Sequence, residues 1–218
     1  MSLEVASSAF LEGYRLALEG KGTIETLVPS LLDLEPLSRP FAFEGGAMGC
    51  RLLDQRDGGL RTEHFASAAG TKWEPLVRLG IGCALARLKI EPQDDPHTLD
   101  GYGFQVGLMT GIAAGGEPTR SPHSERGRGR ALWFVTGGRA DACARAIRGA
   151  PSADALWRGV GTACAFAGDP LSWADRLLEI ARGFENEVTR GVHDAVGLWS
   201  VLEGVPPGRT LEVARAVS

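Results

Sequence analysis

The stretch FAFEGGAMGCRLLDQ at residues 41–55 decides the fold of this chain. Alanine, leucine, methionine and glycine recur in it at spacings of three and four, and it lacks the valine, isoleucine and threonine that strands favour. The stretch therefore predicts a helix. Three further stretches have a similar texture with few β-branched residues, and we predict helices there too, at 73–89, 102–114 and 152–167.

These four stretches are also rich in glycine. The chain has 30 glycines among 218 residues, about twice the usual share. A glycine inside a helix costs about 1 kcal/mol relative to alanine, so we expect these glycines to serve close helix–helix contacts. Small residues four apart would form a flat stripe on each helix, at Gly45/Gly49, Gly80/Ala84, Gly82/Ala86, Gly107/Gly111, Gly159/Ala163 and Gly161/Ala165.

The remaining sequence predicts shorter elements. Apolar spacing predicts helices at 2–19 behind a Ser2 cap, at 23–34 with a break near Pro29, and at 139–149, 170–183, 185–203 and 209–217. The run ALWFVT predicts a short strand at 131–136, and the polar sequence at 115–130, rich in glycine and proline, predicts a loop. We expect a mainly α-helical bundle that forms a single domain over residues 1–218.

Two short patterns recur along the chain in the order A-B-A-B. Pattern A is Phe43-Glu44-x-Gly46-x-Met48 and again Phe104-Gln105-x-Gly107-x-Met109; pattern B is Gly80-Ile81-Gly82-x-Ala84-x-Ala86 and again Gly159-Val160-Gly161-x-Ala163-x-Ala165. The recurrence predicts two pseudo-repeated helical halves at about 39–90 and 100–168, followed by C-terminal helices at 170–217. The alternative is chance similarity between helices rich in glycine and alanine.

Charge and composition disfavour several classes of function. The net charge of -4 provides no attraction to nucleic acid, and no apolar run approaches the ~20 residues needed to cross a bilayer. The four cysteines form no C-x-x-C pair, so neither a zinc site nor a disulfide framework is indicated. The N-terminal residues do not resemble a secretory signal. We expect a cytoplasmic protein that needs no metal and no cofactor.

Two short patterns are similar to known functional motifs, but the residues around them do not fit those motifs. Gly80-Ile81-Gly82 is similar to the start of a dinucleotide fingerprint, but helical spacing precedes it where that fingerprint needs a strand. Asp94-Asp95 followed by Asp100 is similar to the magnesium-binding aspartates of class I terpene synthases, but two prolines flank the pair. Helix packing and a solvated loop are the predictions for these two segments.

Glu44 is the residue that we single out for chemistry. It lies among apolar neighbours, where burial would raise the pKa of its carboxyl, as a general acid or base requires. The alternative is a position on the exposed edge of its helix near Arg51. If the repeat reflects a duplication, Glu44, Tyr102 and Gln105 would meet at a shared pocket across a pseudo-twofold axis.

The segment at 120–130 is basic. Arg120, His123, Arg126, Arg128 and Arg130 face only the two acidic residues Glu117 and Glu125 nearby. The segment is either a solvated insertion or a docking patch for a phosphate or for the acidic face of a carrier protein. The sequence leaves both interpretations open.

Several blocks in this order resemble a known family. They are Arg39-x-Phe41-Ala42-Phe43-Glu44-Gly45-x-Ala47-Met48-Gly49, Gly80-x-Gly82-x-Ala84-Leu85-Ala86, Asp100-Gly101-Tyr102-Gly103-Phe104, Gly129-Arg130-x-Leu132-Trp133-Phe134 and Leu156-Trp157-x-Gly159-Val160-Gly161-x-Ala163-Cys164-Ala165-x-Ala167-Gly168. Over about residues 39–168 the chain is similar to the bacterial enediyne biosynthesis protein family (domain of unknown function 1702). The resemblance implies a role in secondary metabolism, among polyketide biosynthetic proteins. It implies no settled mechanism.

From the residues and the resemblance together we expect an enzyme that binds a hydrophobic polyketide- or isoprenoid-like intermediate and cyclises or isomerises it. Glu44 and Tyr102 are the predicted catalytic residues. The predicted substrate-binding residues are Phe41, Phe43, Phe104, Gln105, Arg130, Trp133 and Trp157. The alternative is a non-catalytic carrier, chaperone or scaffold. The expected partners are the intermediate itself, an acyl carrier protein at the arginine-rich segment, and a second copy of the chain in a homodimer.

Overall fold

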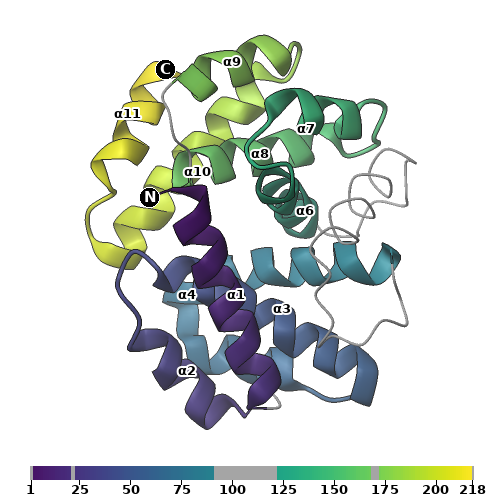
Figure 1. The fold of residues 1–218 in the computed structure, drawn as a ribbon, viewed down its shortest axis with the longest axis vertical. Helices are drawn as coiled ribbons and strands as arrows, with labels where there is room; N and C mark the ends of the chain where they lie inside the picture. The colour runs from purple at the N-terminus through teal and green to yellow at the C-terminus, as the bar shows by residue number, and fades with distance from the viewer. Residues whose placement is uncertain (1, 21–22, 91–121, 168–171, 218) are drawn as a thin grey trace.

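The computed structural model describes residues 2–20, 23–90, 122–167 and 172–217, and all the regular elements within these ranges are helices (Figure 1). The predicted mainly α-helical single domain is confirmed. The helices are α1 (Leu3–Glu19), α2 (Ile24–Leu32), α3 (Arg39–Asp57), α4 (Arg61–Ile90), α6 (Pro122–Val135), α7 (Ala140–Ile147), α8 (Ala153–Phe166), α9 (Ser172–Ile180), α10 (Glu185–Glu203) and α11 (Gly208–Ala216).

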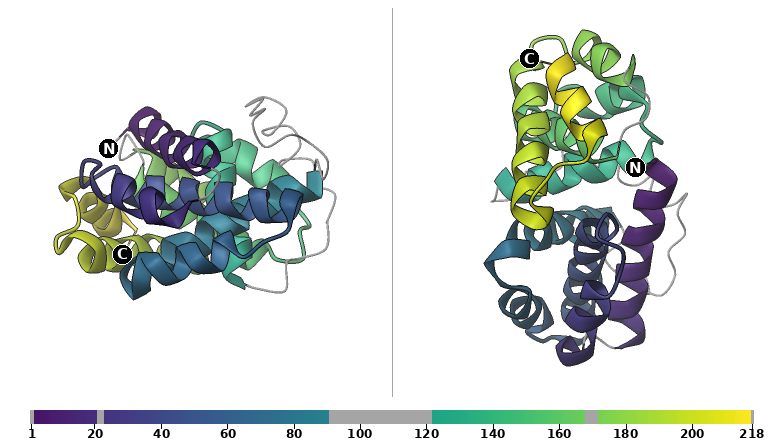
Figure 2. Two further views of the ribbon diagram at one scale, coloured as in Figure 1. Left: turned by 90° about the horizontal axis from the view of Figure 1, so that it is seen from below. Right: turned by 90° about the vertical axis from the view of Figure 1, so that its left-hand side faces the viewer.

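Six of these helices form a framework in which each packs against the next: α1, α3, α4, α6, α8 and α10. α1 to α4 gather at one end of the molecule and α6 to α11 towards the other, with α6 at the boundary between the two groups (Figure 1). In Figure 2, α1 (purple) lies along the outside of the first group. The two groups therefore meet where α4 packs against α6.

The framework helices contact one another through glycine. On α1, a Cβ atom added to Gly13 would lie 1.9 Å from the carbonyl oxygen of Ala42, and one added to Gly45 on α3 would lie 1.9 Å from that of Phe10. No side chain fits at such distances, because a backbone oxygen on a helix cannot move aside. α1 and α3 therefore approach so closely that both crossing positions require glycine.

The same reciprocal arrangement recurs at two further crossings. In each, a glycine lies against the carbonyl oxygen of the residue three positions before the partner's glycine. Between α6 and α8, the added Cβ atom of Gly129 would lie 2.0 Å from the carbonyl oxygen of Leu156, and that of Gly159 would lie 2.1 Å from the carbonyl oxygen of Arg126. Between α8 and α10, the corresponding distances are 2.3 Å from Gly161 to the carbonyl oxygen of Val188 and 2.0 Å from Gly191 to that of Arg158. One packing device thus joins three pairs of helices.

The two central crossings also use glycine. A Cβ atom on Gly80 of α4 would lie 2.1 Å from the carbonyl oxygen of Glu44 on α3, and one on Gly127 of α6 would lie 2.5 Å from that of Leu79 on α4. The predicted packing role is confirmed for Gly45, Gly80, Gly159 and Gly161. The predicted helix at 102–114, with Gly107 and Gly111, lies outside the described residues.

Two predictions about α6 are wrong. The strand at 131–136 is the C-terminal part of a helix, and the loop at 115–130 is helical from Pro122 onward. Proline is well placed at the first position of a helix, where its missing N–H costs no hydrogen bond. Gly127 and Gly129 act as contact residues rather than as helix breakers. The glycines that suggested a loop are the reason that α6 can enter the centre of the bundle.

Two smaller differences concern α2 and α4. The helix α2 continues through Pro29 without a break, because burial of Leu27 and Leu31 compensates for the lost hydrogen bond. α4 begins at Arg61, earlier than the predicted 73, and bends at Gly70, whose φ of 76° is a left-handed conformation that suits glycine. The predicted Ser2 cap is confirmed, with Ser2 Oγ accepting from Val5 N at 3.3 Å.

The two copies of pattern B lie in equivalent surroundings. Gly80 on α4 and Gly159 on α8 each pack against a backbone carbonyl oxygen of the preceding framework helix, α3 and α6 respectively. The second copy of pattern A, at 104–109, lies outside the described residues. Only the two copies of pattern B can therefore be compared within the described residues.

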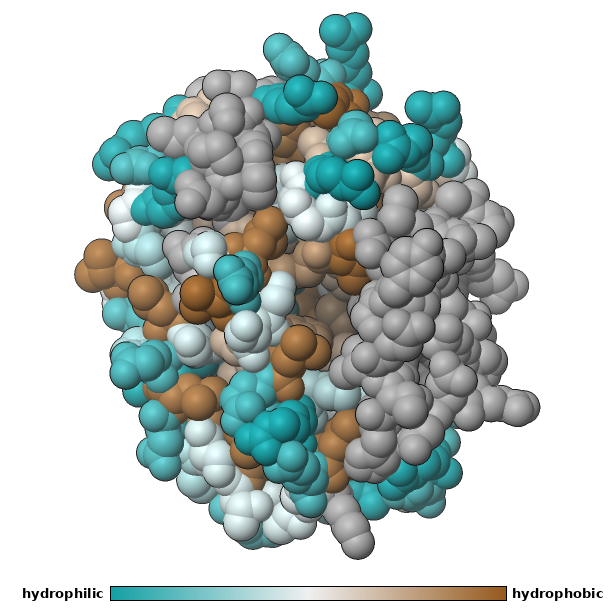
Figure 3. Space-filling view, viewed as in Figure 1, coloured by the Kyte–Doolittle hydropathy of each residue, from teal (hydrophilic) through white to brown (hydrophobic). Residues whose placement is uncertain are grey.

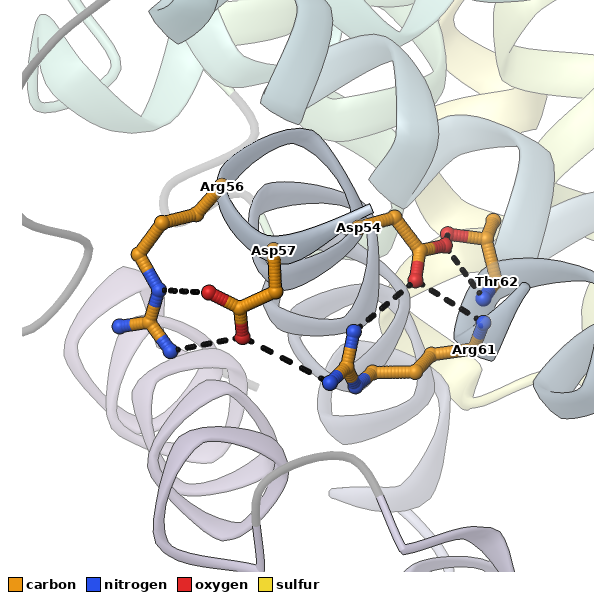
Figure 4. A network of polar contacts seen from close by, with 5 residues as sticks. All are labelled: Asp54, Arg56, Asp57, Arg61 and Thr62. Atoms are coloured by element: carbon orange, nitrogen blue, oxygen red, sulfur yellow. Dashed lines mark hydrogen bonds and ion pairs between the residues drawn. The ribbon is translucent and has the colours of Figure 1, made fainter. Parts of the chain in front are cut away.

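A polar network fixes the turn between α3 and α4 (Figure 4). Asp54 accepts hydrogen bonds from the backbone N–H of Arg61 at 2.9 Å and from both the N–H (2.9 Å) and the hydroxyl (2.6 Å) of Thr62. The carboxylate thereby caps the N-terminus of α4. Burial tends to raise the pKa of Asp54, but these hydrogen bonds and the nearby charge of Arg61 outweigh it and lower that pKa.

The helices that the structure describes include none that is both long and apolar enough to cross a membrane.

Candidate functional site

A buried ion pair joins the two groups of helices. Glu44 on α3 and Arg130 on α6 are each only 1% exposed. Arg130 Nε donates a hydrogen bond to Glu44 Oε2 at 2.8 Å, and Arg130 Nη2 lies 2.6 Å from Glu44 Oε1. Glu44 is thus buried, as one of the two interpretations required, and the exposed position near Arg51 is excluded. The predicted catalytic carboxylate and one predicted binding residue are direct neighbours.

Aromatic rings surround the guanidinium of Arg130. Its Cζ atom lies 4.4 Å from the ring centroid of Phe166, 5.4 Å from that of Phe41 and 5.8 Å from that of Phe134. These distances suit cation–π attraction, which partly offsets the cost of removing the cation from water. Phe41, another predicted binding residue, therefore belongs to the surroundings of the ion pair.

A cavity of about 240 Å³ lies beside this pair. Its walls come from α1, α3, α4 and α6, and the lining residues are Ser7, Phe10, Leu11, Glu44, Met48, Cys83, Arg130, Ala131, Phe134 and Val135. The lining is almost entirely apolar apart from the ion pair. Leu11 is 49% exposed, so the cavity reaches solvent along α1. Figure 3 shows a hollow with brown, apolar residues on its walls near the middle of the face seen in Figure 1.

One nitrogen of the ion pair has no partner among the described residues. Arg130 Nη2 lies 2.6 Å from Glu44 Oε1 and completes a two-point contact, whereas Arg130 Nη1 has no hydrogen-bond partner in the described part of the chain. Because buried polar groups are normally satisfied, unpaired donors in the wall of a cavity call for an explanation. A bound molecule with a hydrogen-bond acceptor would supply one.

Burial affects the pKa values of two groups that line the cavity, the Glu44 carboxyl and the Cys83 thiol. Burial raises the pKa of the Glu44 carboxyl, while the charge of Arg130 and its hydrogen bond act in the opposite direction. Burial and the neighbouring charge of Glu44 raise the pKa of the Cys83 thiol to about 12. The thiol, which contacts the carbonyl oxygen of Gly127 at 3.5 Å, therefore stays protonated at neutral pH and is no nucleophile.

The other predicted binding residues lie away from the cavity. Phe43 packs on Trp73 with ring centroids 4.1 Å apart, in the core formed by α2, α3 and α4. Trp133 and Trp157 are buried in the core around α6 and α8. Tyr102, Phe104 and Gln105 lie outside the described residues. The structure thus brings together Glu44, Arg130 and Phe41, and it places Phe43, Trp133 and Trp157 elsewhere.

The arginine-rich segment is not a uniform basic surface. Arg128 is buried and contacts both carboxylate oxygens of Glu125 at 3.0 Å, and Glu125 also accepts a hydrogen bond from Ser152 at 2.6 Å. Arg130 is buried against Glu44, as described above. Two of the arginines proposed for a docking patch therefore point into the protein. Arg126 lies partly exposed on another side of α6.

Much of the cavity wall was absent from the sequence prediction. α1 contributes Ser7, Phe10 and Leu11, although its sequence is that of an ordinary amphipathic surface helix. Phe134 was missed because 131–136 was assigned to a strand. The spacing of Arg126, Arg130 and Phe134, each four residues apart, is a helical signal that would have placed Phe134 beside Arg130.

Across the ranges that the structure describes, there is no group of three or more His, Cys, Asp or Glu side chains arranged to hold a metal ion.

Most of the chain, including the helices that line the cavity, matches a known protein family. A family model described as "Protein of unknown function (DUF1702)" matches residues 1–111 and 117–206. The chain belongs to the DUF1702 family. The predicted family resemblance is confirmed and extends beyond 39–168, so that α1, which lines the cavity, lies within the DUF1702 region. The family description contains no reference to enediyne biosynthesis. No curated protein and no solved structure matches the chain significantly.

Proposed function

We propose that this DUF1702 protein binds a hydrophobic intermediate of natural-product biosynthesis in the cavity beside Glu44 and Arg130. The observation that supports this proposal is the combination of apolar walls with one buried guanidinium, whose Nη1 has no hydrogen-bond partner among the described residues. Ligand pockets commonly have this composition, in which apolar walls provide affinity and a few polar groups fix orientation. The enediyne association rests on the family resemblance alone and is part of the proposal.

The charge of the site indicates which ligands it takes. Glu44 and Arg130 carry opposite charges and together are neutral. A ligand carboxylate beside them would add an unpaired negative charge in an apolar environment, at a high desolvation cost. A carbonyl oxygen would accept a hydrogen bond from Arg130 without that cost. The proposed ligand is therefore neutral, with a carbonyl or similar acceptor at one end and an apolar body.

The size of the cavity limits how much of a ligand it encloses. A volume of about 240 Å³ lies just below the roughly 300–1,000 Å³ of typical ligand pockets. The described walls therefore enclose a small molecule or the polar end of a longer one. The exposed Leu11 at the edge of the cavity offers an apolar surface for the rest of a longer ligand.

Binding without catalysis, as in a carrier, is the function that the geometry supports best. A general base must reach the proton that it removes, whereas the Glu44 carboxylate is held by Arg130. One observation favours catalysis as a second candidate: burial raises the pKa of Glu44, as suits a general acid. In that case the ligand would have to displace Arg130 from Glu44 before proton transfer, and cyclisation or isomerisation would follow.

Binding is tested with octan-2-one as a neutral ketone probe, in a ligand-observed NMR titration of the full-length protein. We expect saturable one-to-one binding. The variant Ser7→Trp should fill the cavity from α1 and weaken this binding about tenfold or more. Gly197→Trp is the matched control, because Gly197 lies in a different cavity and an added Cβ atom meets nothing within 4 Å. Unchanged binding in Ser7→Trp would refute the proposal.

Catalysis is tested separately, with extracts of a producing strain that lacks the gene. An enzyme should make a hydrophobic intermediate disappear and a product appear, in amounts far above that of the protein. A carrier should only co-purify with the intermediate in a one-to-one ratio. Turnover in such an assay would replace the carrier function by the catalytic one.

A further inference from the structure

A second cavity lies at the crossing of α4, α6, α8 and α10. It has a volume of about 350 Å³, and its lining residues are Pro75, Leu79, Arg126, Thr162, His193, Asp194, Gly197, Leu198 and Val201. One part of the wall is apolar, formed by Pro75, Leu79, Leu198 and Val201. The other part is charged. This amphipathic lining differs from that of the first cavity.

Two arginines share one carboxylate at the charged wall. Arg158 holds Asp194 in a two-point contact, with Nε 2.7 Å from Oδ2 and Nη2 2.9 Å from Oδ1. Arg126 reaches the same carboxylate only loosely, with Nη1 3.7 Å from Oδ2. Glu187, a further carboxylate nearby, contacts Arg190 at 2.7 Å. Among the residues that the structure describes, Arg158 thus neutralises the charge of Asp194, and Arg126 remains as an additional positive charge.

The exposure and the pKa of Arg126 agree with this balance of charges. Its side chain is 24% exposed, so the guanidinium is partly removed from water yet accessible from the cavity. Burial and the adjacent positive charge of Arg158 lower the pKa of Arg126, and the charges of Asp194 and Glu187 oppose this only in part. An anion would relieve this repulsion and gain charge-assisted hydrogen bonds.

We infer that this second cavity is a binding site for an amphipathic oxyanion, a carboxylate or phosphate that carries an apolar chain. The oxyanion would contact Arg126, and the chain would lie against Leu79, Leu198 and Val201. The site has the opposite charge preference to the first cavity, where Glu44 neutralises the arginine. The inference does not depend on the proposed function, because the two cavities share α4 and α6 but no lining residue.

Octanoate and octan-1-ol are matched probes for this site, since they have the same chain length and differ in charge. Ligand-observed NMR titrations of the full-length protein at low salt should give tighter binding for octanoate. Arg126→Gln should weaken octanoate binding by about tenfold or more, as expected for loss of a hydrogen bond to a charged group, and should leave octan-1-ol binding unchanged. The control Arg145→Gln removes an exposed arginine on α7 and should have no effect.

Gly197→Trp tests the location. A Cβ atom on Gly197 meets no atom within 4 Å, so the indole should enter the cavity without displacing α10, and octanoate binding should be lost. Ser7→Trp, which fills the first cavity, should leave octanoate binding intact. Equal affinity for octanoate and octan-1-ol, no saturable octanoate binding, or loss of octanoate binding in Ser7→Trp but not in Gly197→Trp would each overturn the inference.

Discussion

At the scale of single residues, the proposed function rests on Glu44 and Arg130. A buried ion pair is a weak source of stability, because desolvation of the two charges offsets most of their attraction. Its position in the wall of an apolar cavity agrees with the proposed recognition of a ligand. The pair also affects the choice of Glu44 variants, since replacing Glu44 alone by an uncharged residue leaves a buried, uncompensated guanidinium.

Replacing one member of the pair should therefore cost more than replacing both. We expect Glu44→Gln to lower the free energy of unfolding by about 3–5 kcal/mol, because Arg130 would lose its counter-charge. The double variant Glu44→Met/Arg130→Met should recover most of that loss, since two apolar side chains need no partner. Urea denaturation followed by circular dichroism measures both. Equal destabilisation in the single and double variants would contradict this account of the pair.

At the scale of elements, the bundle is held by glycine crossings and by the capped turn between α3 and α4. At a glycine crossing, a backbone carbonyl oxygen lies against a glycine. At the capped turn, backbone N–H groups donate hydrogen bonds to a carboxylate. Gly→Ala substitutions test the first contact, and the pH dependence of stability tests the second.

The glycine crossings predict opposite effects for two Gly→Ala substitutions. Gly161→Ala should destabilise the protein by about 1–3 kcal/mol, the usual range for overpacking, because its Cβ atom would lie 2.3 Å from the carbonyl oxygen of Val188. Gly197→Ala, on α10, should stabilise it by up to about 1 kcal/mol, since alanine is the better helix former and has space there. Urea denaturation compares the two. A stabilising Gly161→Ala would mean that α8 and α10 are not in close contact.

The capped turn predicts a dependence of stability on pH. The folded state lowers the pKa of Asp54, so the carboxylate stabilises the fold above its unfolded pKa of about 3.9. This contribution is lost as pH falls through the folded value. Asp54→Asn should destabilise the protein by about 1 kcal/mol at pH 7, and the difference from wild type should shrink in acid. Asp33→Asn, at an exposed position, should behave like wild type at every pH. A constant difference for Asp54→Asn would contradict the cap.

The elements also show what the sequence could and could not predict. The sequence pattern identified α3 and α8 through small and apolar residues three and four apart with few β-branched residues, and α10 through its apolar spacing. It failed at α6, where Gly127 and Gly129 have the composition of a loop and acquire their purpose only from Leu79 and Leu156 on other helices. The burial of Glu44 was one of two interpretations that the sequence left open, and its apolar neighbours were the reason for considering it. Its pairing with Arg130 was not predicted, because the two residues lie 86 positions apart and no local pattern links them.

At the scale of the whole molecule, the serial contacts from α1 to α10 make the two groups of helices interdependent. α4 and α6 pack against each other, and the Glu44–Arg130 pair ties α3 to α6. Neither group buries its share of these surfaces alone. The first cavity also exists only when both groups are in place, since its walls come from α1, α3, α4 and α6.

We therefore expect a single cooperative unfolding transition. Tryptophan fluorescence reports on Trp73 in the first group and on Trp133, Trp157, Trp173 and Trp199 in the second. Far-ultraviolet circular dichroism reports on all helices. Both signals should change together across a urea titration, as in two-state unfolding. Two separate transitions, with Trp73 reporting only one of them, would show that the groups fold independently.

The central claim is that a neutral, apolar ligand with a carbonyl group binds in the cavity beside Glu44 and Arg130. The most direct measurement is a nuclear Overhauser experiment on protein with labelled methionine methyl groups, in the presence of octan-2-one. Met48 lines the cavity, and Met48→Leu identifies its signal. We predict an Overhauser contact between the Met48 methyl group and the ligand chain, and its loss in Ser7→Trp. Bound octan-2-one without a contact to Met48, or the same contact in Ser7→Trp, would contradict the claim.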